Sequence, residues 1–189
     1  MNAPRGVSAG LAVDDVAARA RRVRMVLLDV DGVLTDGTLR YGPDGNTERD
    51  FFVRDGSAIK LLSHAGILAG IITGREAASI AVRARDLGLA ECLQGRRVKE
   101  PAWDEVLQRR GLTDDEVAYM GDDFLDLALL RRAGLAAAPS DASPEALAAS
   151  AWVATSPGGR GAVRELIELI LRARGAWDAC VGAEMGSRS

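Results

Sequence analysis

The chain has 189 residues, of which 48% are hydrophobic and 27% are charged, a composition that excludes a disordered chain, a collagen and a coiled-coil rod. Its 24 Lys and Arg against 27 Asp and Glu give a net charge of −3, so we expect no general affinity for nucleic acid. Two distant cysteines, Cys92 and Cys180, indicate neither a disulfide framework nor a cysteine-based zinc site. No apolar run approaches the roughly 18 residues that span a bilayer, so we expect a cytoplasmic protein that does not bind membranes.

Residues 1–24 differ in composition from the rest of the chain. Residues 1–10 are rich in Gly and Ala, and residues 11–24 alternate aliphatic side chains with arginines. We expect an N-terminal arm that is mobile or forms a short surface helix. Asp14 and Asp15 argue against a transit peptide. The rest is expected to form one domain over residues 25–174 and a C-terminal tail over residues 175–189.

From residue 25 onward, short apolar runs alternate with longer amphipathic segments, as is typical of a parallel sheet built from repeated β-α units. The run Met25–Val30 predicts a buried central strand, because it is apolar except for Asp29. The other expected strands are Ile67–Thr73, Glu91–Leu93, Val117–Met120, Leu135–Ala138 and Trp152–Ala154. The expected helices are Asp55–Ala65, Glu76–Leu87, Lys99–Arg110, Asp123–Arg132, Pro144–Ala149 and Ala162–Arg174. The predicted fold class is therefore α/β, with a Rossmann-like, doubly wound, mainly parallel sheet.

One connection, after the first strand, is unusually long. About twenty residues stand where a β-α loop normally has two to six. Segments 38–41 and 47–53 look extended and flank the turn sequence Gly42–Asn46, so we expect a β-hairpin insertion. Phe51 and Phe52 are expected to be exposed and to need a partner surface. The chain has no room for a separate cap domain.

The strongest motif, Asp29-Val30-Asp31-Gly32, follows the first strand, at the sheet edge where open α/β sheets bind ligands. If the strand continues through both acidic residues, its period of two places Asp29 and Asp31 on the same side. Two neighbouring carboxylates repel each other unless a cation or a shared proton compensates, so the pair indicates a divalent metal or an acid/base division of labour. By itself the motif also fits an ordinary turn after a strand.

Three further motifs lie at strand ends or helix starts. Thr73 places a hydroxyl at a strand end, and Lys99 opens a helix, where a cation is unfavourable unless it serves an anion. The sequence Gly-Asp-Asp at 121–123 follows another strand, and helical spacing places Asp122 and Asp126 on one face. Each motif alone fits a strand cap, a surface lysine or a helix N-cap. The four motifs together are not explained by packing.

These four motifs resemble those of the haloacid dehalogenase-like phosphatase superfamily. Over about residues 24–174 the chain resembles more narrowly the uncapped family of 3-deoxy-D-manno-octulosonate 8-phosphate phosphatases. The segments that carry this resemblance are Asp29–Gly37, Phe52–Gly56, Ile71–Arg75, Gln94–Lys99, Gly121–Asp123 and Gly158–Ala162. The resemblance implies hydrolysis of a phosphate monoester.

The resemblance also implies catalytic roles for four residues. Asp29 is expected to attack phosphorus and form an aspartyl-phosphate. Asp31 is expected to protonate the leaving alcohol and then to deprotonate the hydrolytic water. Thr73 and Lys99 are expected to hold the non-bridging phosphate oxygens.

Mg²⁺ is the cofactor that the resemblance implies. Its expected ligands are the Asp29 carboxylate, the Asp31 backbone carbonyl and Asp122. Asp123 and Asp126 are expected to support these ligands from outside the metal's coordination sphere.

The implied substrate is a small anionic sugar-acid phosphate, and its expected binding residues are Arg54, Gly74, Arg75 and Arg160. Arg75 favours an eight-carbon substrate, because sialic-type phosphatases of the resembling families can carry an acidic residue there; alternatively, it only braces the loop after Thr73. Arg160 lies in a glycine-rich turn at a helix start, where free amides favour an anion. The alternative is a close-packed turn with a solvated arginine.

Without a cap, the site either admits a macromolecule or is closed by neighbouring subunits, and the resemblance implies a homotetramer. Two other functions stay open at this point. One is a phosphatase of sialic-type nonulosonate 9-phosphates, and the other is a catalytically silent oligomerisation module. Retention of Asp29, Asp31, Thr73, Lys99 and Asp122 argues against a silent module.

Overall fold

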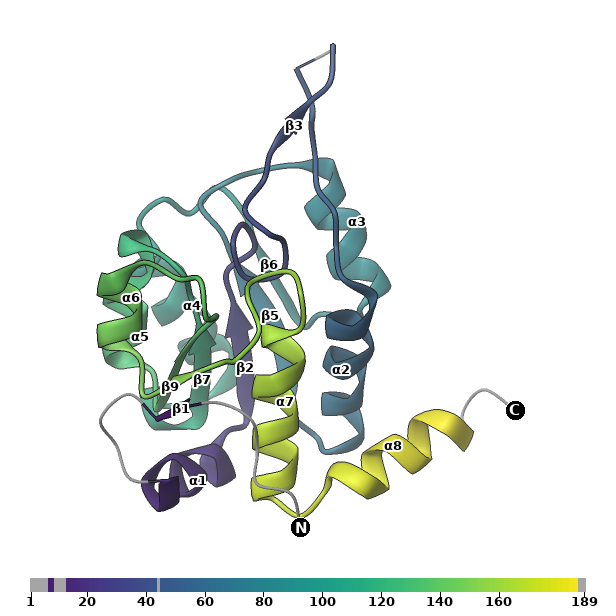
Figure 1. Ribbon diagram of the computed structural model, residues 1–189, viewed down its shortest axis with the longest axis vertical. Helices are drawn as coiled ribbons and strands as arrows, with labels where there is room; N and C mark the ends of the chain where they lie inside the picture. The colour runs from purple at the N-terminus through teal and green to yellow at the C-terminus, as the bar shows by residue number, and fades with distance from the viewer. Residues whose placement is uncertain (1–6, 9–12, 44, 187–189) are drawn as a thin grey trace.

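The computed structural model describes residues 7–8, 13–43 and 45–186, and within them a seven-stranded sheet forms the centre (Figure 1). All neighbouring strands are parallel except the first pair, which is antiparallel. The strands in spatial order are β1 (Val7–Ser8), β9 (Trp152–Val153), β8 (Leu135–Ala138), β7 (Val117–Met120), β2 (Met25–Leu28), β5 (Leu68–Ile72) and β6 (Glu91–Leu93). The mainly parallel α/β sheet is as predicted.

Helices cover both faces of this sheet. One core is formed with α1 (Val13–Arg22), α2 (Val53–His64), α3 (Ala78–Asp86), α7 (Ala162–Ala173) and α8 (Trp177–Gly186). The other is formed with α4 (Glu100–Arg110), α5 (Leu127–Arg132) and α6 (Pro144–Ala149). Two short 3₁₀ helices, η1 (Asp114–Glu116) and η2 (Phe124–Asp126), precede β7 and α5.

Strand β2 shows why the apolar run at its position is continuous. Val26 and Leu28 belong to the first core, whereas Met25 and Leu27 belong to the second, and all four are buried. A strand with a core on each face needs apolar side chains at every position. The predicted core residues Trp103 and Trp152 are buried, as are those of the apolar α7 face: Leu166, Ile167, Leu169, Ile170 and Leu171.

The strand order reverses at β2. The chain runs outward from β2 to β5 and β6, then returns to β7 on the other side of β2. Ligands of such sheets bind beyond the carboxyl ends of the strands at this reversal. The loop after β2 carries the expected hairpin, β3 (Arg40–Tyr41) and β4 (Thr47–Glu48), which projects from the sheet edge (Figure 1). This hairpin is the insertion found after β2, and the described residues contain no cap domain.

Two expectations about exposed segments differ from the structure. Phe51 is half-buried, packs against the first core and lies under the Arg83 guanidinium, 5.5 Å from its ring centroid. Phe52 is also half-buried, so the prediction of an exposed pair was wrong: for Phe51, the first core and Arg83 of α3 in the same chain supply the partner surface. The tail expected after residue 174 contains helix α8, whose Trp177 and Cys180 are buried.

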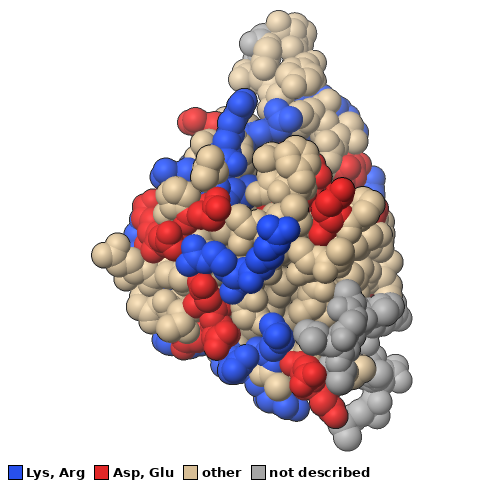
Figure 2. Space-filling model, turned by 90° about the vertical axis from the view of Figure 1, so that its left-hand side faces the viewer, with Lys and Arg blue, Asp and Glu red and all other residues tan. Residues whose placement is uncertain are grey.

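The N-terminal segment contributes to the fold where the structure describes it. Helix α1 buries Val16 and Ala20, and β1 pairs with β9. Residues 1–6 and 9–12 of the expected arm lie outside the described residues. In the part of the chain that is described, no helix has both the length and the apolar character to cross a membrane. On the face shown in Figure 2, basic and acidic side chains interleave.

Candidate active site

Asp29 lies directly beyond the end of β2, where its backbone N–H donates to the Met120 carbonyl at 3.0 Å. This hydrogen bond continues the pairing with β7 and fixes the residue at the carboxyl edge of the sheet. Only 8% of Asp29 is exposed, and its Oδ1 lies 2.8 Å from Lys99 Nζ. A buried carboxylate therefore faces a buried ammonium at the point where the strand order reverses.

Asp122 comes from the end of β7, and the loop after β2 approaches it closely. Gly32 has φ +92°, and a Cβ at this position would lie 2.1 Å from Asp122 Oδ2. Glycine is therefore required both by the backbone conformation and by the Asp122 carboxylate. The Asp-x-Asp-Gly motif ends in Gly because this close approach leaves no space for a side chain.

Asp126 holds the site together. Its Oδ1 accepts hydrogen bonds from Lys99 Nζ at 2.6 Å and from the Tyr119 hydroxyl at 2.5 Å. Its Oδ2 accepts from the backbone N–H groups of Asp122 at 3.0 Å and Asp123 at 3.2 Å. Asp123 in turn accepts from the N–H of Phe124 and caps η2. The structure thus brings Asp126 and Asp122 together, but Asp122 lies in the loop before η2 and not on a helix, so their contact comes from this hydrogen bond to the Asp122 N–H and not from helical spacing.

Lys99 precedes α4 and is only 3% exposed. Its ammonium contacts Asp29 and Asp126, and it also lies 3.2 Å from the Tyr119 hydroxyl. Burial lowers the pKa of Lys99, but the two carboxylates more than compensate and raise it. Lys99 is therefore a permanent positive charge at the edge of the sheet.

The acidic groups of the site repel one another. Burial and the charge of Asp126, only partly offset by Lys99, raise the pKa of Asp29 from 3.8 to about 6. Burial and the charges of Asp29, Asp126 and Asp123 raise the pKa of Asp122 from 3.8 to about 8. The single positive charge of Lys99 does not balance the negative charges of these carboxylates. An additional cation bound among them would balance those charges.

Carboxylate oxygens of Asp29, Asp122 and Asp126 lie within 4.8 Å of one another. Because both oxygens of Asp126 already accept hydrogen bonds, Asp29 and Asp122 are the carboxylates with room for a metal. An all-oxygen set of this kind suits a hard divalent cation such as Mg²⁺. The donor chemistry and the excess negative charge both fit the expected metal site.

Asp31 lies beyond the end of the strand. Strand β2 ends at Leu28, so the condition under which the period of two would place Asp29 and Asp31 on the same side is not met. Its Oδ1 lies 2.6 Å from Arg49 Nε, and its Oδ2 lies 3.2 Å from Arg49 Nη2 and 3.3 Å from Arg75 Nε. The Asp31 carboxylate thus faces two guanidinium groups.

Thr73 follows β5 and is 1% exposed; its Oγ1 accepts from the Arg75 N–H at 3.4 Å. Gly74 and Arg75 line a hollow of about 520 Å³ between the hairpin and the start of α3, together with Arg49 and Arg97 among others. Arg75 and Arg97 give this hollow positive charge, which suits an anionic ligand, although Glu76 also lines it and the Arg49 side chain is fully buried.

Arg54 and Arg160 lie apart from these contacts. Arg54 is exposed on the first turn of α2, and Arg160 lies 3.4 Å from Asp36. The amides expected to be free beside Arg160 are occupied: Asp55 accepts from the N–H groups of Gly161 at 3.2 Å and Arg164 at 2.8 Å. The start of α7 thus binds a carboxylate of its own chain.

Relatives identify the family. The chain is 39% identical over 168 residues to the 3-deoxy-D-manno-octulosonate 8-phosphate phosphatase KdsC of Escherichia coli K12, with 89% of each sequence covered. The chain belongs to the 3-deoxy-D-manno-octulosonate 8-phosphate phosphatase family. A relative of the same name from Yersinia pestis is 39% identical over 92% of both chains. Residues 90–166 also match the haloacid dehalogenase-like hydrolase family.

Solved structures agree with this family. The Moraxella catarrhalis 3-deoxy-D-manno-octulosonate 8-phosphate phosphatase, in complex with magnesium, phosphate and KDO, superposes with a TM-score of 0.88 at 34% identity. The match covers 91% of this chain and 99% of that one. A cobalt-bound Haemophilus influenzae phosphatase of this family has a TM-score of 0.81 at 37% identity, covering 83% and 92%. The narrower resemblance found in the sequence is confirmed.

Sequence reasoning missed three residues near the site. Tyr119 and Arg49 contact the acidic residues described above, and Asp55 supports the start of α7. For Tyr119 a signal existed, because a tyrosine within a buried strand needs a partner for its hydroxyl. Arg49 gave no such signal, because its contact depends on how the hairpin folds back over the loop after β2.

Proposed function

We propose that this chain is a Mg²⁺-dependent phosphomonoesterase that hydrolyses 3-deoxy-D-manno-octulosonate 8-phosphate to the free sugar acid and phosphate. The observation that carries the proposal is the buried Asp29 at the end of β2, between Lys99 and Asp122. The named activity of the relatives supports the substrate. The product would enter the synthesis of lipopolysaccharide precursors, which places the reaction in the cytoplasm.

In the first half-reaction, a carboxylate oxygen of Asp29 attacks phosphorus while the ester P–O bond breaks. The product is an aspartyl-phosphate, and Asp31 gives a proton to the leaving alcohol oxygen. In the second half-reaction, Asp31 takes a proton from a water molecule. The water oxygen attacks phosphorus, the bond between phosphorus and the Asp29 oxygen breaks, and Asp29 and inorganic phosphate are released. Dividing the hydrolysis into two displacements replaces one difficult step by two easier ones.

The other residues of the site stabilise charge. Lys99 and the Thr73 hydroxyl hold the non-bridging oxygens, where negative charge remains throughout the transfer. Bound by Asp29, Asp122 and the Asp31 carbonyl, Mg²⁺ supplies positive charge that lets an anionic nucleophile approach an anionic phosphate. Asp126 keeps Lys99 and the backbone after β7 in place.

Substrate choice is assigned to the arginines around the hollow beside Asp31. Arg75 would pair with the sugar acid beside the backbone of Gly74, and Arg54 and Arg160, which lie outside the hollow, would add positive charge at a greater distance. A sialic-type 9-phosphate is the alternative substrate. Because the described residues include no cap, we also propose that a homotetramer closes the site.

The test compares phosphate release from the octulosonate 8-phosphate, a nonulosonate 9-phosphate and an aryl phosphate. Wild type is expected to prefer the eight-carbon substrate, to stop reversibly on chelation, and to lose all activity in Asp29→Asn. In Arg75→Ala we expect a loss of about 10- to 100-fold on the sugar-acid substrates only. Activity that survives Asp29→Asn would refute the nucleophile, and a preference for the nine-carbon substrate would refute the substrate assignment.

A further inference from the structure

Arg49, in the hairpin inserted after β2, contacts Asp31 through two nitrogens. Its Nε lies 2.6 Å from Asp31 Oδ1, and its Nη2 lies 3.2 Å from Asp31 Oδ2. We propose that Arg49 is a positioning residue, which holds the Asp31 carboxylate where it exchanges a proton with the leaving group. The inference rests on the proposed function, in which Asp31 is the general acid and base.

The Arg49 guanidinium is built into the protein. Its side chain has no exposed surface, and its third nitrogen, Nη1, donates to the Thr47 hydroxyl at 2.9 Å. A planar guanidinium bound at both carboxylate oxygens fixes the orientation of the carboxylate as well as its position. A buried arginine of this kind differs from the arginine of a surface ion pair, because a surface ion pair contributes little to the stability of the fold.

Asp31 has few other contacts that would fix its side chain. Arg75 lies 3.3 Å from Oδ2, but 55% of the Arg75 side chain is exposed, so it is the looser of the two partners. The preceding acidic residue, Asp29, belongs to a cluster of carboxylates and offers no attraction. Without Arg49, the Asp31 side chain would be free to adopt other rotamers.

The location of Asp31 fits the proposed task. Arg49 and Arg75 both line the hollow beside the hairpin, and Asp29 follows the end of β2, two residues before Asp31. The Asp31 carboxylate contacts both of these arginines, and in the proposed function it faces the bridging oxygen of the bound sugar phosphate. Misplacing an acid at this oxygen slows the departure of a poor leaving group most strongly.

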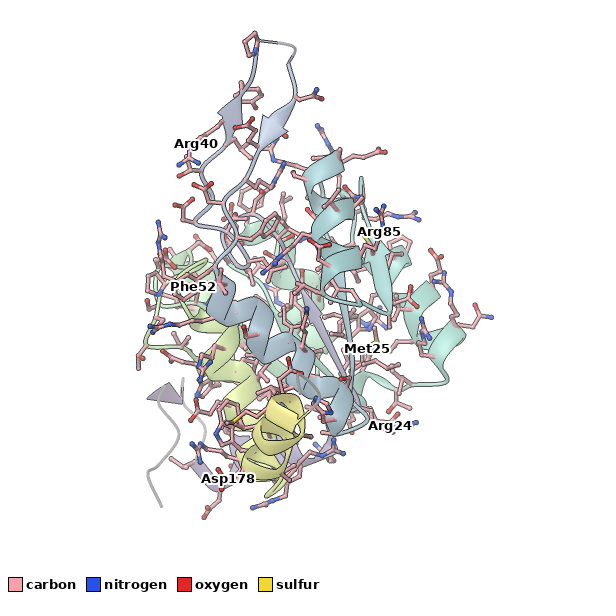
Figure 3. The ribbon with its side chains drawn as sticks, turned by 90° about the vertical axis from the view of Figure 1, so that its right-hand side faces the viewer. Arg24, Met25, Arg40, Phe52, Arg85 and Asp178 are labelled. Carbon is pink, nitrogen blue, oxygen red and sulfur yellow. The ribbon has the colours of Figure 1, made fainter. Side chains whose placement is uncertain are left out.

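The hairpin offers a matched control. Arg40 pairs with Asp50 on the same hairpin, but both side chains are more than half exposed. Figure 3 shows Arg40 on the outer side of the hairpin. Arg40→Ala removes an arginine-carboxylate pair of the same kind without touching Asp31.

The experiment measures kcat/KM with two substrates: the octulosonate 8-phosphate, whose alkoxide leaving group needs a proton, and p-nitrophenyl phosphate, whose leaving group does not. Arg49→Ala is expected to lose about 10- to 100-fold on the alkyl phosphate and less than about threefold on the aryl phosphate. Arg49→Lys keeps the positive charge but loses the contact through two nitrogens. It is expected to show a smaller loss, again larger on the alkyl phosphate than on the aryl phosphate. Arg40→Ala is expected to match wild type on both.

A second comparison uses Asp31→Asn, measured on the octulosonate 8-phosphate, the substrate on which Arg49→Ala alone is expected to lose the most. If Arg49 acts through Asp31, adding Arg49→Ala or Arg49→Lys to Asp31→Asn is expected to change kcat/KM by less than about twofold. Equal losses on the two substrates, or an additive loss in the Asp31→Asn background, would overturn the inference. If Arg49→Ala does not fold, Arg49→Lys decides by the same criteria. Wild type that fails to release phosphate from the alkyl substrate would refute the proposed function, and the inference with it.

Discussion

Asp122→Asn is expected to stabilise the metal-free protein while abolishing its activity. Burial and three neighbouring carboxylates raise the pKa of Asp122 from 3.8 to about 8, so the charged form is unfavourable in the folded state. No hydrogen bond to the Asp122 side chain is found among the described residues, and asparagine has nearly the same shape. The substitution therefore removes a repulsion without removing a contact.

The pH dependence follows from the raised pKa. Between pH 4 and pH 8 the folded protein keeps a proton on Asp122 that the unfolded chain has released, so this group makes stability fall as pH rises across that window. A tenfold change in proton affinity corresponds to about 1.4 kcal/mol, so the full rise in the pKa of Asp122 would correspond to roughly 6 kcal/mol. Asp122 is partly exposed, so solvent screens the repulsion, and we expect about 2 kcal/mol at pH 8.

Urea unfolding of wild type and Asp122→Asn, with chelator present, measures this difference. The advantage of Asp122→Asn is expected to be near zero at pH 4 and to grow to its full value by pH 8. Added Mg²⁺ is expected to stabilise wild type more than the variant, because a ligand that binds the folded state shifts unfolding by mass action. An advantage that does not change with pH, or a less stable Asp122→Asn at pH 8, would refute the electrostatic argument.

Three other outcomes are expected. Gly32→Ala would place a Cβ 2.1 Å from Asp122 Oδ2, so we expect at least a tenfold loss of activity and weaker stabilisation by Mg²⁺; full activity would show that the loop can shift. Asp55→Ala leaves two N–H groups at the start of α7 without their acceptor and should cost about 1–3 kcal/mol in urea unfolding, with Asp36→Ala as an exposed control. Light scattering is expected to give about four times 19.9 kDa, and an active monomer would contradict closure of the site by neighbours.

The sequence predicted those parts of the fold that depend on local patterns. Apolar runs between amphipathic segments identified β2 and β5 to β9, because a strand with a core on each face is apolar throughout. Thr73, Lys99 and Asp122 were found because they directly follow strands or open a helix. Helix α8 was not predicted: it buries Trp177 and Cys180 by packing against α2 and α7, and the sequence pattern does not express this packing.

Contacts between distant segments explain what was missed at the site. Arg49 reaches Asp31 across 18 positions, and Asp55 reaches the N–H of Arg164 across 109. The first contact depends on the direction in which the hairpin bends, and the second on α2 and α7 packing side by side. Arg49 directly follows β4 of the hairpin and Asp55 lies in the first turn of α2, so their positions resemble those of the other site residues, but the sequence pattern does not show which distant groups they reach.

The glycine turn before α7 has a consequence for the order in which the enzyme is made. The Gly159 N–H donates to the Val33 carbonyl at 2.9 Å, and a Cβ on Gly158 would lie 1.8 Å from the Gly32 carbonyl oxygen. The loop that carries Asp31 is thus supported by a segment synthesised much later. A nascent chain emerging from the ribosome carries every proposed catalytic residue before it carries this support, so the finished catalytic loop, and with it turnover, is expected only once Gly158 and Gly159 have emerged.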